Sequence, residues 1–172
     1  MFPPLEPHLI RACKKLKLIK PAAAEWINAV AEPLFIAGRA PRSVETAVMT
    51  TGGVMTAEEM KAARRPLYEK ISAQFLAALT AKGKKDPREA IARTLHLAMR
   101  WRANQRQLEQ AKIRGWAVEV SVAMDNDTCE AAKALHGEIR SPDDPVAFPL
   151  EGCEKPLCRC GHLMLPPRFR GG

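Results

Sequence analysis

The sequence predicts a mainly α-helical protein, with a helical N-terminal body followed by a small, cysteine-rich α+β module. Apolar residues recur three and four positions apart over most of residues 1–115, which is typical of helices. From residue 116 they alternate with polar residues, which is typical of a strand. The charge changes at the same point, because residues 1–116 hold 21 Lys and Arg against 10 Asp and Glu, whereas residues 117–172 hold 6 against 9. We therefore expect two domains, 1–115 and 116–172.

The first two expected helices lie near the N-terminus. Leu9 and Leu16 share the apolar face of the first. The second begins near Pro21, because proline suits a first helical turn, and ends near Gly38. Pro33 is expected to kink this second helix or to end it early.

A third helix is expected after a Thr- and Gly-rich connection. Thr56, with Glu59 three residues later, forms a capping-box signature at its start. Its expected apolar face consists of Met60, Ala63, Leu67, Ile71, Phe75 and Ala78. Because Pro66 interrupts this run, the pattern indicates either one kinked helix or two abutting helices.

The fourth expected helix runs from Pro87 to Arg114 and is strongly basic. Seven Lys and Arg stand against Glu89 and Glu109, and the apolar stripe is thin. Such a face can neutralise DNA phosphates without reading sequence. The candidate nucleic-acid-binding residues are Arg93, Arg100, Arg102, Arg106, Lys112 and Arg114. A solvated helix that pairs with acidic neighbours or with a partner subunit explains the same charges.

The C-terminal module is expected to begin with a strand over Trp116–Met124, where apolar and polar residues alternate. A turn and a short helix ending at Gly137 follow. Three prolines beyond this point leave room only for short strands around 138–140 and 146–150. A module of 56 residues with few large apolar side chains usually needs a covalent or metal staple.

The cysteines are the candidate staple. Four of the five lie in the last 44 residues, at Cys129, Cys153, Cys158 and Cys160. Four thiolates are the ligand set of a closed, tetrahedral structural Zn2+ site, which leaves no position for a substrate. His136 and His162 are alternative ligands, either of which can replace one thiolate. Reduced thiols that pack as small hydrophobic groups are the other interpretation.

Three segments of the module form a pattern of their own: DTCEAAKALHGE at 127–138, FPL at 148–150 and CRC at 158–160. Together they resemble the C-terminal portion of Mu-like phage head-morphogenesis (minor head) proteins, over about the last third of the chain. The resemblance implies that Cys129, Cys158 and Cys160 are metal ligands and that Gly137 is a turn residue. Ala132 stands where that family has a second cysteine, and Cys153 is the residue available to replace it.

The resemblance implies a structural or assembly protein of a phage or prophage particle, in the minor head or head–tail region, rather than an enzyme. Its expected partners are other virion or assembly subunits in an oligomeric assembly, and double-stranded DNA. The expected location is the virion or the bacterial cytoplasm. No apolar run approaches the about 20 residues of a membrane span, and the first ten residues lack the apolar region of a signal peptide.

Two other functions fit parts of the sequence. A small zinc-containing regulator that binds nucleic acid also combines a metal module with a basic helix, and it would show a sequence preference. A zinc deaminase is suggested by His136 and Glu138, which match an H-x-E motif followed by cysteines. The proline that precedes the cysteine pair in deaminases is missing here, and the C-x4-C spacing differs from theirs.

Overall fold

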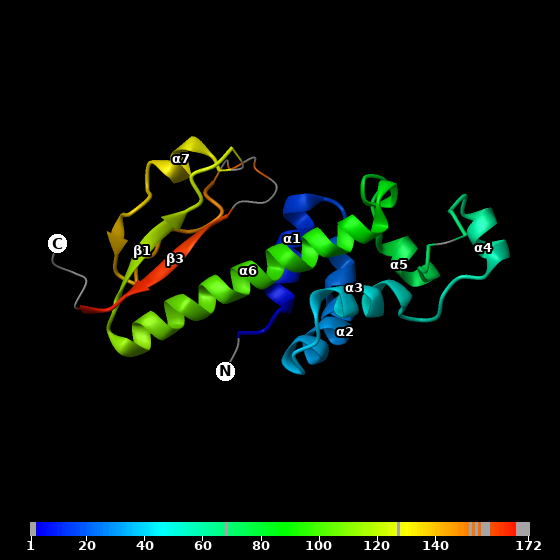
Figure 1. Cartoon of the computed structure of the whole chain (residues 1–172), viewed down its shortest axis with the longest axis horizontal. Coiled ribbons are helices and arrows are strands. Elements are labelled where there is room, and N and C mark those ends of the chain that lie inside the picture. The colour runs from blue at the N-terminus through cyan, green and yellow to red at the C-terminus, as the bar shows by residue number, and fades with distance from the viewer. Residues whose placement is uncertain are drawn as a thin grey trace. The chain divides into compact units, whose positions relative to one another are not determined.

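The computed structural model describes residues 3–67, 69–126, 128–151, 153, 155 and 159–167. Of these residues, 54% are helical, and the small sheet that they form has three antiparallel strands (Figure 1). The protein is therefore mainly α-helical with a small α+β part at the C-terminus, which confirms the expected fold class. No helix in the described part of the chain is long and apolar enough to cross a membrane.

Contacts divide the chain into two units: the helical unit, residues 4–99, and the sheet unit, residues 1–3 with 100–172. The division falls inside helix α6 (Pro87–Arg114), whereas the sequence predicted a boundary at 115. The difference has a local cause. Asn104 on α6 accepts a hydrogen bond from the backbone N–H of His162 on strand β3 (Cys160–Leu165), at 2.8 Å. The last turns of α6 therefore belong with the sheet.

The helical unit consists of short helices and the first turns of α6. Its elements are α1 (Glu6–Leu16), the 3-10 turn η1 (Pro21–Ala23), α2 (Ala24–Ile36), α3 (Pro41–Thr50), α4 (Ala57–Ala62), α5 (Ala73–Ala78) and the 3-10 turn η2 (Gly83–Lys85). Large side chains fill its core, and Leu9, Ile27, Ile71, Phe75 and Ile91 are fully buried. Burial of this apolar area is the main source of stability in such a unit.

Three of the four expected helices form over nearly the predicted residues, as α1, α2 and α6. Pro33 lies inside α2 without ending it. Helix α3 was not predicted, although Val44, Val48 and Met49 give it a buried face. Its sequence, PRSVETAVMT, has only a short apolar repeat, and the packing of these three side chains decides the conformation.

The expected third helix is interrupted around Pro66, as two short helices rather than one. Thr56 caps α4 through the predicted capping box, in which Thr56 and Glu59 each accept a hydrogen bond from the other's backbone N–H. Residues 63–67 and 69–72 are not helical, so α4 and α5 do not abut. Leu67 is 59% exposed, so its predicted place in the core is wrong.

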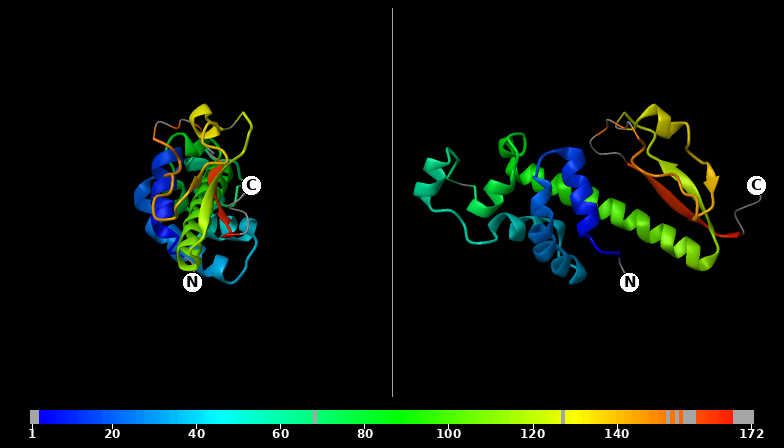
Figure 2. Two further views of the ribbon diagram at one scale, coloured as in Figure 1. Left: turned by 90° about the vertical axis from the view of Figure 1, so that its left-hand side faces the viewer. Right: turned by 180° about the vertical axis from the view of Figure 1, so that it is seen from behind.

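The sheet unit contains the strands in the order β2-β1-β3, and the central strand, β1 (Ala117–Val122), lies within the residues predicted to form a strand. β2 (Ile139–Arg140) matches the expected short strand at 138–140, whereas residues 146–150 do not form a strand. Helix α7 (Glu130–Lys133) lies beside the sheet (Figure 2). β3 was not predicted because its burial is opposite to its hydropathy: His162 is buried and Leu163 is 49% exposed.

Candidate metal centre

Three of the four candidate zinc ligands share one apolar cluster in the sheet unit. We call it the cysteine cluster, and it contains Val120, Val122, Ala132, Phe148, Cys153 and Cys160, with Cys129, Leu135, Val146 and Leu150 packed against it. The thiols come from three separate segments of the chain, and none of the three is in a disulfide. The fourth candidate, Cys158, lies outside the described residues.

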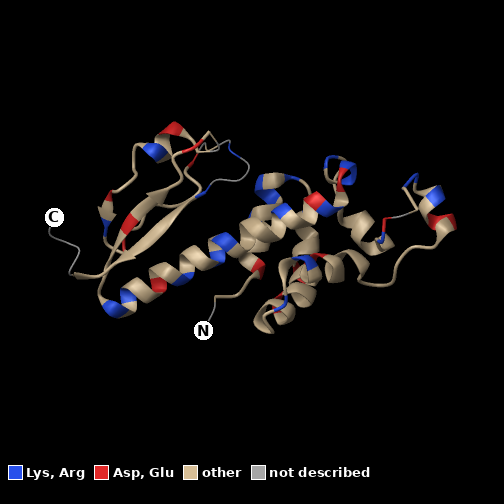
Figure 3. Cartoon of the chain, in the orientation of Figure 1, with Lys and Arg blue, Asp and Glu red and all other residues tan. Residues whose placement is uncertain are grey.

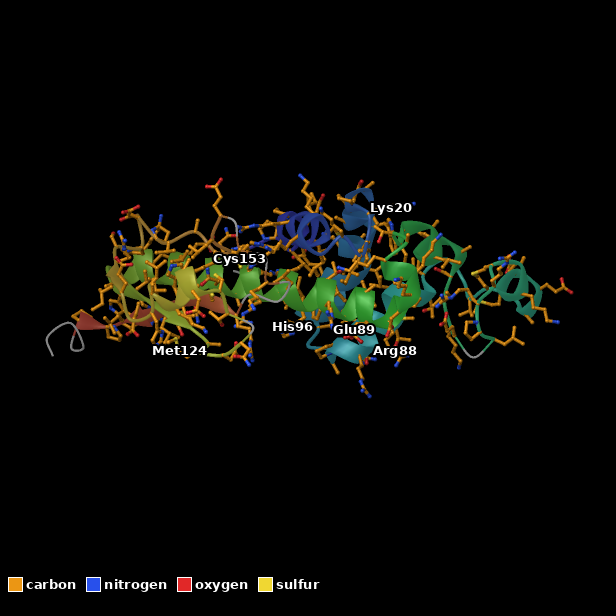
Figure 4. All side chains as sticks on the ribbon, turned by 90° about the horizontal axis from the view of Figure 1, so that it is seen from above. Lys20, Arg88, Glu89, His96, Met124 and Cys153 are labelled. Carbon is orange, nitrogen blue, oxygen red and sulfur yellow. The ribbon has the colours of Figure 1, made fainter. Side chains whose placement is uncertain are left out.

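Each thiol is positioned by its own element. Cys160 is the first residue of β3 and faces Val122 of β1 in register. Cys129 is the N-cap residue of α7. Cys153 (labelled in Figure 4) follows the Pro-rich segment, and its backbone N–H donates to the carbonyl of Leu150 at 3.0 Å. The sheet and the loop before it thus bring Cys153 and Cys160 into the same cluster as Cys129, although they lie 24 and 31 positions after it in the sequence.

The buried part of the cluster is shielded from solvent, and two cations contact the turn before Cys129. Cys153 and Cys160 are 6% and 3% exposed, whereas Cys129 is half-buried. The Lys155 ammonium donates to the Asn126 carbonyl at 2.7 Å. Arg159 forms an ion pair with Asp125. Both cations are therefore held at residues 125–126, close in sequence to the first candidate ligand.

The donor chemistry fits zinc, because several soft thiols are gathered in a site shielded from water. Among the residues that the structure describes, no three His, Cys, Asp or Glu side chains are arranged so that they could already hold a metal ion. A complete site in this region therefore needs Cys158 or a closer approach of the thiols already in the cluster. The candidate ligands thus lie in one cluster, but the described residues do not form a complete metal site.

The two alternative histidine ligands have different surroundings. His136 Nδ1 accepts a hydrogen bond from the backbone N–H of Val122 at 3.3 Å. His162 is 2% exposed, and burial lowers its pKa below the ordinary value. Its ring lies 5.3 Å from that of Phe148, a member of the cysteine cluster. Its Nδ1 lies 3.2 Å from the Asn104 side-chain oxygen, and its buried Nε2 has no hydrogen-bond partner.

Sequence reasoning missed Asn104, which contacts both the backbone and the ring of His162. Nothing in the local pattern of a basic helix distinguishes one asparagine from its neighbours. The residue that it contacts lies 58 positions further along the chain. Only the packing of α6 against the outer edge of β3 makes it part of the site.

The candidate nucleic-acid-binding residues are spaced along α6 (Figure 3) but belong to different units. Arg93 is in the helical unit and forms an ion pair with Glu89, which Figure 4 labels beside Arg88. Arg102 is only 3% exposed and donates from Nε to the Pro3 carbonyl at 2.5 Å. Its predicted place on a DNA-facing surface is therefore wrong, because the guanidinium is used inside the sheet unit.

The other four candidates lie in the sheet unit. Arg100 is half-buried, and Arg106, Lys112 and Arg114 are exposed. The Lys112 ammonium lies 3.2 Å from a carboxylate oxygen of Asp143, and the Arg114 guanidinium lies 4.8 Å from the centre of the Trp116 ring. A surface cavity of about 580 Å³ beside them is lined by Lys112, Gly115, Trp116, Ala117, Ile139, Arg140, Ser141, Pro142 and Asp143.

The structure also gives the contacts of His136 and Glu138, the two residues of the deaminase-like H-x-E motif. Glu138 forms an ion pair with Arg140 at 2.7 Å, and His136 Nδ1 accepts the hydrogen bond from the Val122 backbone N–H described above.

Comparisons of this chain with protein-family models, with curated proteins and with solved structures found no match.

Proposed function

We propose that this chain is a structural or assembly protein of a phage or prophage particle, in the minor head or head–tail region, and that zinc staples its sheet unit. The observation that carries the proposal is the meeting of Cys129, Cys153 and Cys160 in one apolar cluster. Cys129 and Cys160 lie in segments that carry the resemblance to Mu-like head-morphogenesis proteins, and Cys153 is the residue available to replace the cysteine that the family has at Ala132. Cys158 is the expected fourth thiol of the site.

Stability is the reason why the unit would need a metal. Apart from the valines of β1, the buried part of the cysteine cluster contains one large side chain, Phe148. The other large side chains packed against it, Leu135, Val146 and Leu150, are only partly buried. Small domains with so little buried apolar area usually depend on a cross-link. Bound zinc would join the turn before α7, the Pro-rich segment and β3 into one folded body.

The basic residues at the end of α6 support a contact with DNA or with acidic subunits of the particle. Arg106, Lys112 and Arg114 are exposed within the last three turns of this helix. Contacts of this kind to phosphates are independent of sequence and weaken steeply with salt. Arg102 takes no part in this surface.

Elemental analysis of the purified full chain, combined with thiol titration, tests the metal site. We expect one zinc per chain and about four protected thiols, and we expect Cys129→Ser and Cys160→Ser each to lose the metal. Cys13→Ser is the matched control and should keep it, because Cys13 lies in the core of the helical unit. A chain with no metal and with reactive thiols at all four module cysteines would contradict the proposal.

The second candidate function is a zinc-containing regulator that binds nucleic acid. The cavity beside Trp116 favours it, because an aromatic ring flanked by Lys112 and Arg140 can contact a base or a phosphate. Binding to duplexes of different sequence at several salt concentrations separates the two functions. A particle protein should bind all duplexes alike, and Lys112→Ala should reduce the salt slope by about 1. A regulator should prefer one sequence by about 10³-fold or more.

A further inference from the structure

The His162 ring nitrogen Nε2 is a buried polar atom with no hydrogen-bond partner. The residue is 2% exposed, so solvent does not satisfy this nitrogen either. Buried polar atoms in folded proteins are nearly always paired, and an unpaired one indicates a missing partner such as an ion.

The contacts of Asn104 settle the protonation of the ring. The side-chain atom of Asn104 that lies 2.8 Å from the His162 backbone N–H must be the oxygen, because a backbone N–H only donates. The same oxygen lies 3.2 Å from His162 Nδ1, so Nδ1 must carry the proton. In the neutral ring, Nε2 then presents a lone pair. The missing partner is therefore a donor or a metal ion.

This arrangement is the usual one for a histidine that binds a metal. A ligating imidazole donates its other N–H to a neighbouring oxygen, which fixes both the tautomer and the direction of the ring. Here the oxygen of Asn104 would do this for His162. His136 lacks the arrangement, because its Nδ1 already accepts the backbone N–H of Val122.

The position of His162 also fits the cysteine cluster. His162 and Cys160 are two residues apart on β3, so their side chains leave the same face of the sheet. They stand opposite Val120 and Val122 of β1, which both belong to the cluster. The Phe148 ring, 5.3 Å from that of His162, belongs to it as well.

We propose that His162 Nε2 is a ligand of the zinc site, together with the thiolates of Cys129, Cys153 and Cys160, and that Asn104 is its positioning residue. No three His, Cys, Asp or Glu side chains of the described residues are already arranged to hold a metal ion, so zinc binding would bring these four groups closer together. This inference rests on the proposed zinc site and changes its ligand set, because the imidazole takes the place expected for Cys158. Three thiolates and one neutral imidazole give Zn2+ a net charge of −1 instead of −2. The lower charge suits a site built among apolar side chains.

X-ray absorption on the zinc-loaded wild-type chain tests the ligand set without any substitution. We expect one nitrogen and three sulfur ligands. Four sulfur ligands would overturn the inference and leave the proposed zinc site standing. A wild-type chain that binds no zinc would overturn both, so the two failures are distinguishable.

Substitutions test the individual residues by zinc affinity, measured by competition with a chelator. We expect His162→Ala to lose tight binding, and Cys158→Ser and the matched control His136→Ala to keep it. Asn104→Ala should weaken binding about 10- to 100-fold, whereas Asn104→Asp, which keeps an acceptor oxygen, should restore it. Loss of zinc from Cys158→Ser together with retention in His162→Ala would overturn the inference.

Discussion

The two units bury different kinds of side chain. The helical unit has a core of large aliphatic and aromatic residues, such as Leu9, Ile71 and Phe75, which are fully buried. The sheet unit buries the valines of β1, Phe148 and Trp101, and it also buries two cysteines and a histidine. Buried apolar area can therefore stabilise the helical unit, whereas the buried thiols and imidazole of the sheet unit support the proposal that a metal stabilises it.

The largest expected effect is that of metal removal, and it should be confined to one unit. Chelation should remove the amide protection of β1 and β3 while α1–α3 stay protected, because structural zinc contributes about 10–16 kcal/mol in comparable small sites. Hydrogen exchange on the full chain, followed by mass spectrometry, measures both units at once. Unchanged protection of β1 and β3 after chelation would mean that the sheet unit folds without a staple.

Truncation of a side chain in the core of the helical unit should destabilise that unit and leave the sheet unit protected. Phe75→Ala should cost about 3–5 kcal/mol of unfolding free energy in the helical unit, because the ring is fully buried and leaves a cavity. Denaturant unfolding followed by exchange of the α1 and α2 amides measures it. Leu67→Ala is the control and should change stability by less than about 0.5 kcal/mol, since Leu67 is 59% exposed. Equal costs at the two positions would contradict the described core.

The Cys13 thiol should make the helical unit sensitive to alkaline pH. Burial raises the pKa of this thiol from 9.0 to about 11, so between these values the unfolded chain loses the proton and the folded chain keeps it. The contribution of the buried Cys13 thiol to the free energy of unfolding is therefore fully present below pH 9. It falls by about 2–3 kcal/mol as the pH rises to 11.

The measurement is the difference in unfolding free energy between the wild type and Cys13→Ala at each pH. Subtraction removes the titration of the lysines, which both proteins share. The difference should change in favour of Cys13→Ala above pH 9. A constant difference from pH 7 to 11 would show that Cys13 is not buried as described.

The smallest expected effect is local to α4. Thr56→Ala should cost about 1 kcal/mol, because it removes the acceptor of the Glu59 backbone N–H at 3.3 Å. Thr46→Ala is the matched control, since its hydroxyl donates to the Arg42 carbonyl within α3 and caps nothing. Exchange of the α4 amides reports the difference. Equal effects of the two substitutions would argue against the capping box.

Features that depend on neighbouring residues could be predicted from the sequence. The bounds of α6 follow from Pro87 at the first turn and from Gly115 after the last, and the cap of α4 follows from Thr56 and Glu59. The alternation that begins at Trp116 predicts β1. The candidate thiols were also visible, because their clustering along the chain needs no structure to be seen.

Features that depend on residues far apart in the sequence could not be predicted from it. Arg102 looks like a surface cation in its helix, yet it is buried against the Pro3 carbonyl, 99 positions away. His162 looks like a polar residue in a tail, yet it lies inside β3 beside Asn104. In both cases the local residue type favours solvent, and a hydrogen bond from another segment offsets the cost of burial.

The sequence by itself thus determined the fold class, the main helices, the central strand and which thiols are candidates for a metal. Those features come from short-range periodicity and capping, which act within a few turns of chain. Only the tertiary structure decided that the end of α6 belongs to the sheet unit, that Arg102 is buried and that His162 presents an unpaired nitrogen. These depend on contacts between residues 58 or more positions apart, which no local pattern encodes.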